Sequence, residues 1–350
     1  MLSPHIRVVG SLNIDYTTTT PRFPGPGETL TAKSLSISAG GKGANQAVAC
    51  GRASYTSTTE HDVQVEMIGA VGVQDPQYAA LLKPALEKTG IDCSGIREVE
   101  RSQTGTATII VDASNNGENR ILVVPGANYD GMDEVEDVLE RALKEPLPDI
   151  FVLQGEIPAE TTFALLKAIP DTAEKTGKLV EIVFNPAPVY PGGIPLDCMK
   201  CVTHLIVNET EMGQLAVDAG DQYVAANTEG EKRAALVMAA GIFHGRMVRN
   251  VIVTRGAEGV FGSTPAGSFH LEAAKVTKVT DTTAAGDTFV GYYAVILARQ
   301  KKKGGQGASQ DALHEACRQA TLAAAKCVVR EGAIESIPWG YEVEGHISRT

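Results

Sequence analysis

The chain has 350 residues, of which 43% are hydrophobic and 21% charged, as in a globular protein with a sizeable core. Its 31 basic and 42 acidic side chains give a net charge of −11. This charge argues against non-specific binding to nucleic acid, because such binding depends on cationic side chains that neutralise phosphates. A phosphorylated small molecule remains an acceptable ligand, since backbone N–H groups and a bound cation can hold it.

Cysteine usage and hydropathy restrict the class further. Six cysteines in a chain of this length do not form a disulfide framework. Cys198 and Cys201 form a single CxxC without a second cysteine or histidine pair, so we expect a chance pairing in a loop rather than a zinc site. No stretch reaches the ~18 apolar residues that span a bilayer and no leader is visible, so we expect no membrane contact. The cytoplasm is the expected compartment, and nothing in the sequence bars entry to the nucleus.

Short apolar segments alternate with longer helical patterns, which predicts an α/β fold with a doubly wound, mainly parallel sheet flanked by helices. Several segments are apolar at every position, as in strands covered on both faces. The expected core strands are Ile6–Val9, Val65–Ile68, Ile150–Leu153, Leu179–Val183, His204–Val207 and Val251–Val253. The expected helices are Ala44–Gly51, Gln77–Lys88, Asp133–Leu143, Ala159–Lys167, Glu209–Leu215, Gly230–Phe243, Gly286–Arg299 and Asp311–Val329.

Two segments with another pattern are expected to form antiparallel strands of a small β-sheet lid. Residues 16–38 are rich in Thr and Pro, and residues 104–124 flank a turn at Asn115-Asn116-Gly117. Residues 53–62 and 301–309 have the composition of loop insertions, and the lysines of the second suit a solvated loop or, alternatively, an interaction tail. We expect a single domain over residues 1–350.

Common nucleotide and catalytic motifs are absent from the sequence. There is no G-x-x-x-x-G-K-[ST] loop, no HExxH and no GxSxG. Gly41-x-Gly43 lacks the third glycine of a dinucleotide fingerprint, because Gln46 stands there. The chemistry must therefore come from other segments.

Residues 281–289 (DTTAAGDTF) open an expected helix and form the strongest candidate site. Ala284, Ala285 and Gly286 are small, so their backbone N–H groups can approach a ligand where a helix N-terminus has unpaired donors. Such an anion hole suits a phosphate in transfer. The Asp287 carboxylate beside it can take the proton of an attacking hydroxyl, although it can also serve only as a helix cap.

Two N-terminal segments add polar groups to glycine-rich backbone. Residues 40–47 (GGKGANQA) join a lid strand to a helix and carry Lys42 and Asn45. Asn13 and Asp15 alternate after the first strand, so both side chains point to one face and suit the vicinal hydroxyls of a sugar. A ligand-free turn and ordinary polar loop residues are the alternatives.

Two later segments follow apolar strands. Asn208 and Glu211 lie at a strand-to-helix turn, where they suit Mg²⁺ held through water or, alternatively, an N-cap with an acidic first turn. Residues 253–259 (VTRGAEG) are placed to receive a nucleotide, with a plain hairpin turn as the alternative.

Together, these five segments resemble the ribokinase subgroup of the ribokinase-like (PfkB) carbohydrate kinases. The resemblance runs from Val8 to Trp339, with residues 40–47 similar to the first family signature and 281–289 to the second. Asn185-Pro186-Ala187-Pro188 and Arg330-Glu331-Gly332-Ala333 occur in the expected order and spacing. Each segment alone is a weak signal, whereas the ordered set is specific.

The resemblance implies ATP-dependent phosphorylation of D-ribose at the 5-hydroxyl. It implies Asp287 as catalytic base beside an anion hole of Ala284, Ala285 and Gly286. For ribose, it implies contacts from Asn13, Asp15, Gly41, Lys42, Gly43, Asn45, Glu156 and Asp287. For ATP, it implies contacts from Asn208, Glu211, Thr254, Arg255, Gly256, Gly259, Gly286 and Thr321, with Glu211 reaching Mg²⁺ through water. For an activating K⁺, it implies the Asp281 carboxylate, the carbonyls of Thr283, Cys327, Arg330 and Gly332, and the Ser336 hydroxyl.

Some residues depart from the family pattern. Ala284 stands where many relatives have glycine, and Glu335 replaces a proline often found beside the cation site, which bears on the affinity for K⁺. The implied lid would close over the sugar and exclude water, and its exposed edge would suit a homodimer.

Two other functions are alternatives to ribose phosphorylation. The first is a kinase of the same family that acts on another sugar, a deoxyribose or a nucleoside, although the lid segments offer few aromatic residues for a base. The second is a non-catalytic sugar sensor, which would have lost the base or the metal residues that this chain retains.

Overall fold

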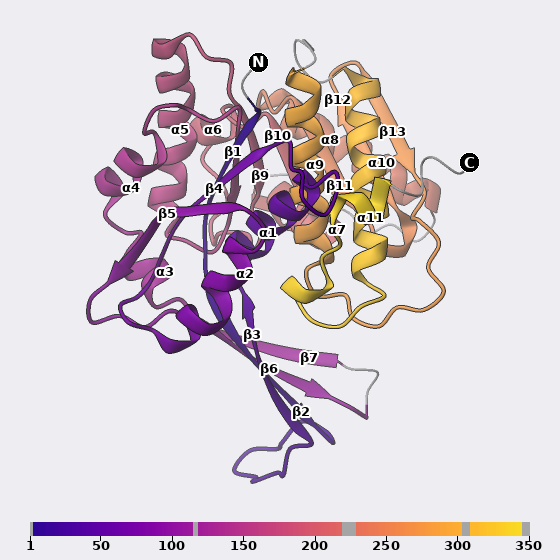
Figure 1. Cartoon of the computed structure of the whole chain (residues 1–350). Helices are drawn as coiled ribbons and strands as arrows, with labels where there is room; N and C mark the ends of the chain where they lie inside the picture. Colours follow the sequence, from indigo (N-terminus) through magenta and orange to yellow (C-terminus); the bar gives the residue numbers. More distant parts are fainter. Residues whose placement is uncertain (1–2, 115–117, 219–228, 303–308, 345–350) are drawn as a thin grey trace.

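The computed structural model describes residues 3–114, 118–218, 229–302 and 309–344. Within these residues, nine strands form a large sheet, and four more form a small sheet that projects from one end of the molecule (Figure 1). The large sheet has the spatial order β13 (Gly267–Leu271), β12 (Val260–Thr264), β11 (Asn250–Thr254), β10 (His204–Asn208), β9 (Glu181–Asn185), β8 (Ile150–Gln154), β1 (His5–Val9), β4 (Gln64–Gly72) and β5 (Ile91–Val99). All neighbours from β11 to β5 are parallel, and only β12 and β13 pair antiparallel. The predicted fold class is confirmed.

Helices cover both faces of this sheet, because its strands are apolar on both sides. In β8, Ile150 and Val152 belong to one core cluster, and Phe151 and Leu153 to the other. The first cluster includes α1 (Lys42–Ser54), α2 (Lys83–Glu87) with the π-helical turn η1 (Tyr78–Leu82), α9 (Ala285–Lys302), α10 (Gln310–Cys327) and α11 (Gly340–Glu344). The second includes α3 (Ala127–Asp130), α4 (Val135–Ala142), α5 (Ala159–Thr176), α6 (Leu196–Met199), α7 (Glu209–Asp218) and α8 (Glu229–Gly245). None of the described helices is long and apolar enough to cross a membrane.

Two expected element boundaries shift for identifiable reasons. Strand β9 begins at Glu181 rather than Leu179, whose side chain is 76% exposed. Helix α5 runs past its expected end and includes Pro170, because its buried face continues beyond that residue. It ends at Gly177, which adopts the left-handed conformation typical of a helix C-terminus.

The small sheet has the order β3 (Ser34–Gly40), β2 (Asn13–Thr20), β6 (Gly105–Asp112) and β7 (Glu118–Val124). Strand β2 pairs antiparallel with β3, and β6 pairs antiparallel with β7, but β2 and β6 are parallel. The expectation of antiparallel pairing is therefore wrong for this central pair. Strands β2 and β6 follow β1 and β5, which are parallel, so both leave the large sheet in the same direction. The turn predicted at residues 115–117 lies outside the described residues.

The first expected insertion, residues 53–62, is anchored at both ends. Ala53 and Ser54 are buried and belong to α1, so the expected loop begins later. Asp62 accepts from Arg299 Nε at 2.8 Å and Nη2 at 2.9 Å. The prediction of a loop insertion is therefore wrong for Ala53 and Ser54.

The second expected insertion begins inside a helix. Lys301 belongs to α9 and donates through Nζ to the carbonyls of Leu179 at 2.9 Å and Asp149 at 3.2 Å. The expected loop therefore begins after Lys302, and residues 303–308 lie outside the described residues.

Helices α1 and α9 pack at unusually close range. A Cβ atom built on Gly291 would lie 2.4 Å from Ala49 Cβ and 2.7 Å from Cys50 N, so no side chain fits there. The two helices can approach because α1 is built largely from small residues. This approach places the first turn of α1 against the first turn of α9.

We predict that Gly291→Ala lowers the free energy of unfolding by about 1–3 kcal/mol, because the added methyl group forces α1 and α9 apart. Gly241→Ala in α8 is the matched control, since no atom lies within 4 Å of its Cβ position. It should raise the free energy of unfolding by up to about 1 kcal/mol. Urea denaturation of both variants measures the difference, and equal stabilities would contradict the close packing.

Candidate active site

Polar residues follow the parallel strands at one edge of the large sheet. Asn13 follows β1, Glu156 follows β8, Asn185 ends β9, Asn208 ends β10 and Thr254 ends β11. Carboxyl ends of parallel strands are the usual location of ligand sites in open α/β sheets. The lid sheet starts at this same edge, because β2 follows β1 after three residues.

Buried polar atoms gather where the lid meets the large sheet. Asn13, Asp15 and Asn45 are only 3%, 8% and 6% exposed. Asn13 Oδ1 accepts from Asn128 Nδ2 at 2.7 Å. Within the described part of the chain, Asp15 Oδ1 and Asn45 Oδ1 are buried without a hydrogen-bond partner. A buried unpaired acceptor costs about 1–3 kcal/mol, so this pair suits a ligand that carries hydrogen-bond donors.

The Asp15 carboxyl titrates near neutral pH. Burial raises its pKa to about 7, and the nearby carboxylates of Glu156, Asp287 and Glu335 add to the rise. Gly40 permits this burial, because a Cβ there would lie 2.1 Å from Asp15 Oδ2. Protonation of Asp15 therefore changes the hydrogen-bonding character of the pocket over the physiological range.

The glycine segment packs directly onto the loop that follows β1. Gly41 has φ of 87°, and a Cβ there would lie 2.8 Å from Asn13 N. A Cβ at Gly43 would lie 2.5 Å from Ser11 N. Both positions require glycine, so these predicted site residues bring backbone close to the pocket.

Glu156 is hydrogen-bonded both to the loop after β1 and to the backbone of Lys42 at the start of α1. Glu156 Oε2 accepts from Ser11 Oγ at 2.5 Å and from the Lys42 N–H at 2.8 Å. Burial lowers the pKa of Lys42, but Asp287, Glu156 and Glu211 outweigh this effect and raise it above its usual value. Lys42 is therefore a cation held between carboxylates.

Asp287 lies in the first turn of α9 and is 6% exposed. Its Oδ2 accepts from Asn45 Nδ2 at 3.0 Å, and its Oδ1 accepts from Gln46 Nε2 at 2.9 Å. Both donors belong to α1, so the carboxylate has a tertiary role that a simple helix cap lacks. The sequence prediction missed Gln46, although a glutamine within a helix of small residues is a signal, since a buried amide needs partners.

The predicted anion hole lies at the start of α9. Its first-turn N–H groups, including that of Gly286, have no carbonyl four residues earlier within the helix. The Ala285 N–H makes a long contact of 3.3 Å to Thr282 O. Ala284 has φ of 58°, a left-handed conformation that costs about 1–2 kcal/mol in alanine. This conformation explains why glycine also suits the position.

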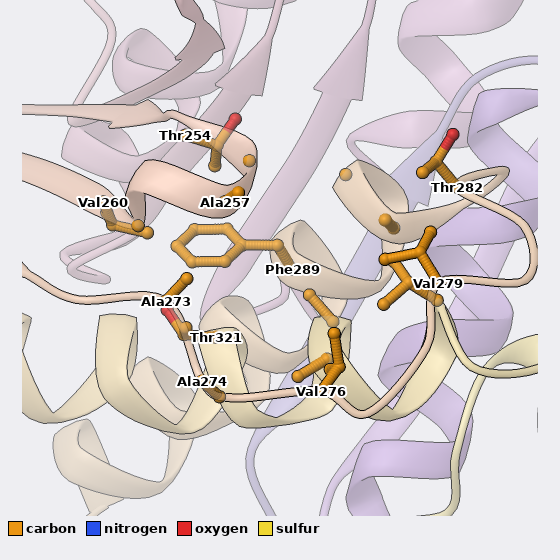
Figure 2. A pocket seen from close by; sticks show the side chains of 17 residues that line it. Thr254, Ala257, Val260, Ala273, Ala274, Val276, Val279, Thr282, Phe289 and Thr321 are labelled. Atoms are coloured by element: carbon orange, nitrogen blue, oxygen red, sulfur yellow. The ribbon is translucent and has the colours of Figure 1, made fainter.

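Two adjoining cavities extend from Asp287 across the edge of the sheet. One, of about 290 Å³, is lined mainly by apolar side chains and is shown in Figure 2, where Phe289 and Thr321 are among the labelled lining residues. The other, of about 230 Å³, is lined by Lys42, Asn208, Glu211 and Asp287, among others. Thr254, Thr282 and Gly286 line both cavities, so the two form one continuous site.

Part of the segment predicted to receive the nucleotide, residues 253–259, lines this site, and part of it is buried. Gly256 and Gly259 line the larger cavity, as do Thr254 and Ala257. Arg255 is 6% exposed and does not line either cavity. Its Nε donates to Glu209 at 3.0 Å, which gives it a structural position at the turn.

Asn208 and Glu211 bind each other's backbone. The Glu211 N–H donates to Asn208 Oδ1 at 2.8 Å, and the Asn208 N–H donates to Glu211 Oε2 at 2.9 Å. This is the reciprocal pattern of a capping box, so Asn208 caps the start of α7, as the alternative interpretation predicted. Burial raises the pKa of Glu211, although the Asn208 N–H and Lys42 oppose the rise. Both side chains also line the smaller cavity, where carboxylate and amide oxygens suit Mg²⁺ held through water.

The residues predicted to hold K⁺ come together beside α9. Asp281 Oδ1 accepts from the N–H and hydroxyl of Thr283 at 2.9 and 2.6 Å, and its Oδ2 accepts from the Gly332 N–H at 3.0 Å. Cys327 Sγ lies 3.0 Å from Ser336 Oγ and 3.5 Å from Thr283 O. The donor set is rich in oxygen, which suits a hard cation.

Arg330, the remaining residue of that set, lies in the turn after α10. Its N–H donates to Cys327 O at 3.0 Å, and its guanidinium group pairs with Glu342 at 2.9 Å. One of the predicted carbonyl ligands, that of Cys327, thus already accepts a backbone hydrogen bond.

The CxxC pair lies away from this edge of the sheet. Cys198 is buried in the short helix α6 rather than in a loop, and Cys201 follows the helix. The Cys201 thiol donates to Asp197 O at 3.5 Å, and burial raises the pKa of both thiols. Neither residue belongs to the candidate site.

The chain is similar to carbohydrate kinases over nearly its whole length. The model of the pfkB family carbohydrate kinases matches residues 3–340. A ribokinase of Schizosaccharomyces pombe is 32% identical over 345 residues, which cover 97% of each chain. A deoxyribokinase of Salmonella typhi is 32% identical over 336 residues, which cover 95% of each chain.

A solved structure has the same architecture. Ribokinase of Arabidopsis thaliana, complexed with ribose and ATP, superposes with a TM-score of 0.76 at 26% identity, over the full length of both chains. The glycine segment, the aspartate at the start of α9 and the two cavities lie within the matched region. This chain therefore belongs to the pfkB family of carbohydrate kinases and is a phosphotransferase.

Proposed function

We propose that this protein transfers the γ-phosphoryl group of ATP to the 5-hydroxyl of D-ribose, with ribose 5-phosphate and ADP as products. The observation that carries the proposal is the position of the Asp287 carboxylate. It lies at a helix N-terminus between the unpaired oxygens of Asp15 and Asn45 on one side and the cavity lined by Lys42 on the other. A sugar bound at those oxygens and a triphosphate in the cavity would meet at Asp287.

The proposed reaction needs a base and a stabiliser of negative charge. Asp287 accepts the proton of the 5-hydroxyl while the sugar oxygen forms a bond to the γ-phosphorus. The bond from the γ-phosphorus to the β,γ-bridging oxygen breaks, and ADP leaves with that oxygen. The N–H groups at the start of α9 and the Lys42 ammonium face the charge that develops on the phosphoryl group.

The two adjoining cavities suit the two halves of ATP. The adenine ring would occupy the apolar cavity. The Thr321 hydroxyl there donates to Cys317 O at 2.8 Å, so it offers only lone pairs to a ligand. Lone pairs accept from the 6-amino group of adenine, whereas the 6-carbonyl of guanine has no hydrogen to donate at the same position. Mg²⁺ would bind with ATP near Glu211 through water, where it neutralises phosphate charge. K⁺ would be held beside α9 by the oxygens around Asp281 and Thr283.

Ribose is proposed over related acceptors because of the chemistry of the buried pocket. Asn13, Asp15 and Asn45 offer two carboxylate oxygens and two amides, which match adjacent hydroxyls. The similarity to a relative named deoxyribokinase makes 2-deoxyribose the necessary comparison. Loss of one hydroxyl contact would cost ~1–3 kcal/mol.

We also propose a homodimer formed through the lid. Large apolar side chains are exposed on both edge strands of the small sheet, including Leu35 (62%) and Ile37 (42%) on β3 and Ile121 (53%) and Leu122 (66%) on β7. Open strand edges with apolar side chains are typical pairing surfaces. A second copy of this lid would cover them.

The first experiment measures ADP release with Mg²⁺-ATP, with and without K⁺, over a panel of sugars and nucleosides. We expect ribose to be the best acceptor and K⁺ to stimulate turnover. Asp287→Asn should lower kcat by about 10²- to 10⁴-fold while ribose still binds, because it removes the base. A higher rate with another sugar or a nucleoside would overturn the acceptor. Binding of ribose without turnover by the wild type would favour a sensor.

We predict that the KM for ribose depends on pH through Asp15. Its carboxylate accepts from sugar hydroxyls when ionised, and its pKa of about 7 makes it protonated at lower pH. The KM should therefore rise as pH falls below 7, by up to about tenfold per pH unit. Steady-state kinetics from about pH 5.5 to about pH 8.5 measures this.

Asp15→Asn is the control for this pH dependence. It should raise the KM for ribose at high pH and remove the dependence, since an amide does not titrate in this range. A variant that kept the pH dependence of the wild type would assign it to another group.

The dimer is tested by size-exclusion chromatography with light scattering. The wild type should have the mass of a dimer, and Leu122→Lys should have the mass of a monomer, because a charge at the lid edge prevents pairing. Leu196→Lys on α6 is the control, since Leu196 is also exposed (58%) but lies outside the lid. Equal masses for both variants would count against the lid interface.

A further inference from the structure

The side chain of Gln46 is fully buried in α1 and is hydrogen-bonded to three other side chains at the candidate site. It is 0% exposed, so it cannot touch a substrate. Its Nε2 donates to Asp287 Oδ1 at 2.9 Å and to Asn185 Oδ1 at 3.0 Å. Its Oε1 accepts from Gln154 Nε2 at 2.9 Å. Both hydrogens of the amide and one of its acceptor sites are therefore in use.

Backbone carbonyls fix the direction of this chain of amides. Asn185 Nδ2 donates to Ile206 O at 2.8 Å, so Asn185 must present its oxygen to Gln46. Gln154 Nε2 lies 3.4 Å from Val152 O, which favours the orientation that also presents its nitrogen to Gln46. Because a carbonyl only accepts, these two ends leave Gln46 with its NH₂ toward the carboxylate. The arrangement admits no flipped amide.

We propose that Gln46 is the positioning residue for the catalytic base. It holds Asp287 Oδ1 with a donor of fixed direction, which favours the ionised carboxylate and leaves the remaining lone pairs for the acceptor hydroxyl. Asn45 donates to Asp287 Oδ2, but its own oxygen also lines the proposed sugar pocket. Gln46 has no access to a substrate, so it can affect the reaction only through Asp287. The inference rests on the proposed role of Asp287 as base.

Other charged groups also face Asp287 and set the background for this effect. Lys42 at the start of α1 is attractive, whereas Asp15 on β2 and Glu211 on α7 are repulsive. Burial raises the pKa of the Cys327 thiol of α10, and the charge of Asp287 adds a smaller effect. The amide groups of Asn45 and Gln46 on α1 hold the two carboxylate oxygens of Asp287 in place among these charges.

The test is Gln46→Met in the full-length protein, assayed with the acceptor that the wild type uses best. We expect kcat to fall about 10- to 100-fold, the effect of losing one hydrogen bond to a charged group, with the KM for acceptor and ATP within about threefold. The acid limb of kcat against pH should move to higher pH, because the carboxylate loses a donor. A poor rate with ribose alone would count against the proposed acceptor and not against this role.

Gln300→Met is the matched control. It makes the same change on α9, where Gln300 donates to Ala312 O at 2.9 Å far from Asp287 in the helix. It should keep the kcat and pH profile of the wild type. An unmoved acid limb for Gln46→Met, an equal loss of kcat in both variants, or a rise in KM at constant kcat would each overturn the proposal.

Gln154→Met tests the same chain one link further out and remains informative if Gln46→Met fails to fold. It should lower kcat by about 3- to 10-fold and move the acid limb in the same direction. The reason is that Gln46 Oε1 loses the amide group that donates to it. The double variant should be no worse than Gln46→Met alone, since both act through one path. Additive losses, or an unmoved acid limb in Gln154→Met, would overturn the proposal.

Discussion

The close contact between α1 and α9 at Gly291 is the constraint on which the site depends. The carboxylate of Asp287 belongs to α9, and both of its side-chain donors belong to α1. Hydrogen bonds of 2.9–3.0 Å join residues separated by 241 and 242 positions in sequence, so a small change in the distance between the helices would break them. The missing side chain at Gly291 is therefore a requirement of the chemistry as well as of the packing.

Electrostatics at the site reflect an excess of negative charge. Asp15, Glu156, Glu211 and Asp287 gather around Lys42, and two of the four have a raised pKa as a result of burial and of one another. A triphosphate brings more negative charge to the same place. The N-terminus of α9, Lys42 and the bound cations that we propose would balance it. The overall charge of −11 therefore does not prevent binding of an anionic substrate, because local dipoles and cations determine the field at the site.

Much of the fold and part of the site could be predicted from sequence. The pattern of strands apolar on both faces predicted the parallel sheet, and residues 281–289 were correctly predicted to open a helix, α9. The parallel pairing of β2 with β6 could not be predicted, because strand order depends on contacts between distant segments. Helix α5 passes through Pro170 because tertiary burial outweighs local propensity.

The site residues that sequence reasoning missed are those whose role lies in contacts to other side chains. Gln46, Asn128 and Gln154 are buried amides with no motif of their own, and each becomes visible only through its partners. Arg255 is the opposite case, since its motif position predicted a ligand contact, whereas its side chain pairs with Glu209. Adjacency in a motif does not determine the direction of a side chain.

The separation of the two halves of the site along the chain has a consequence for its synthesis. The ribosome makes the lid strands β2 and β3 and the glycine segment early, whereas α9 and α10, which cover one face of the large sheet, are made near the end. A nascent chain that stops before residue 285 lacks both α9 and α10 and exposes that apolar face. This face of the sheet therefore stays uncovered until most of the chain has been translated, and exposed apolar surface of this kind makes an incomplete chain prone to aggregation.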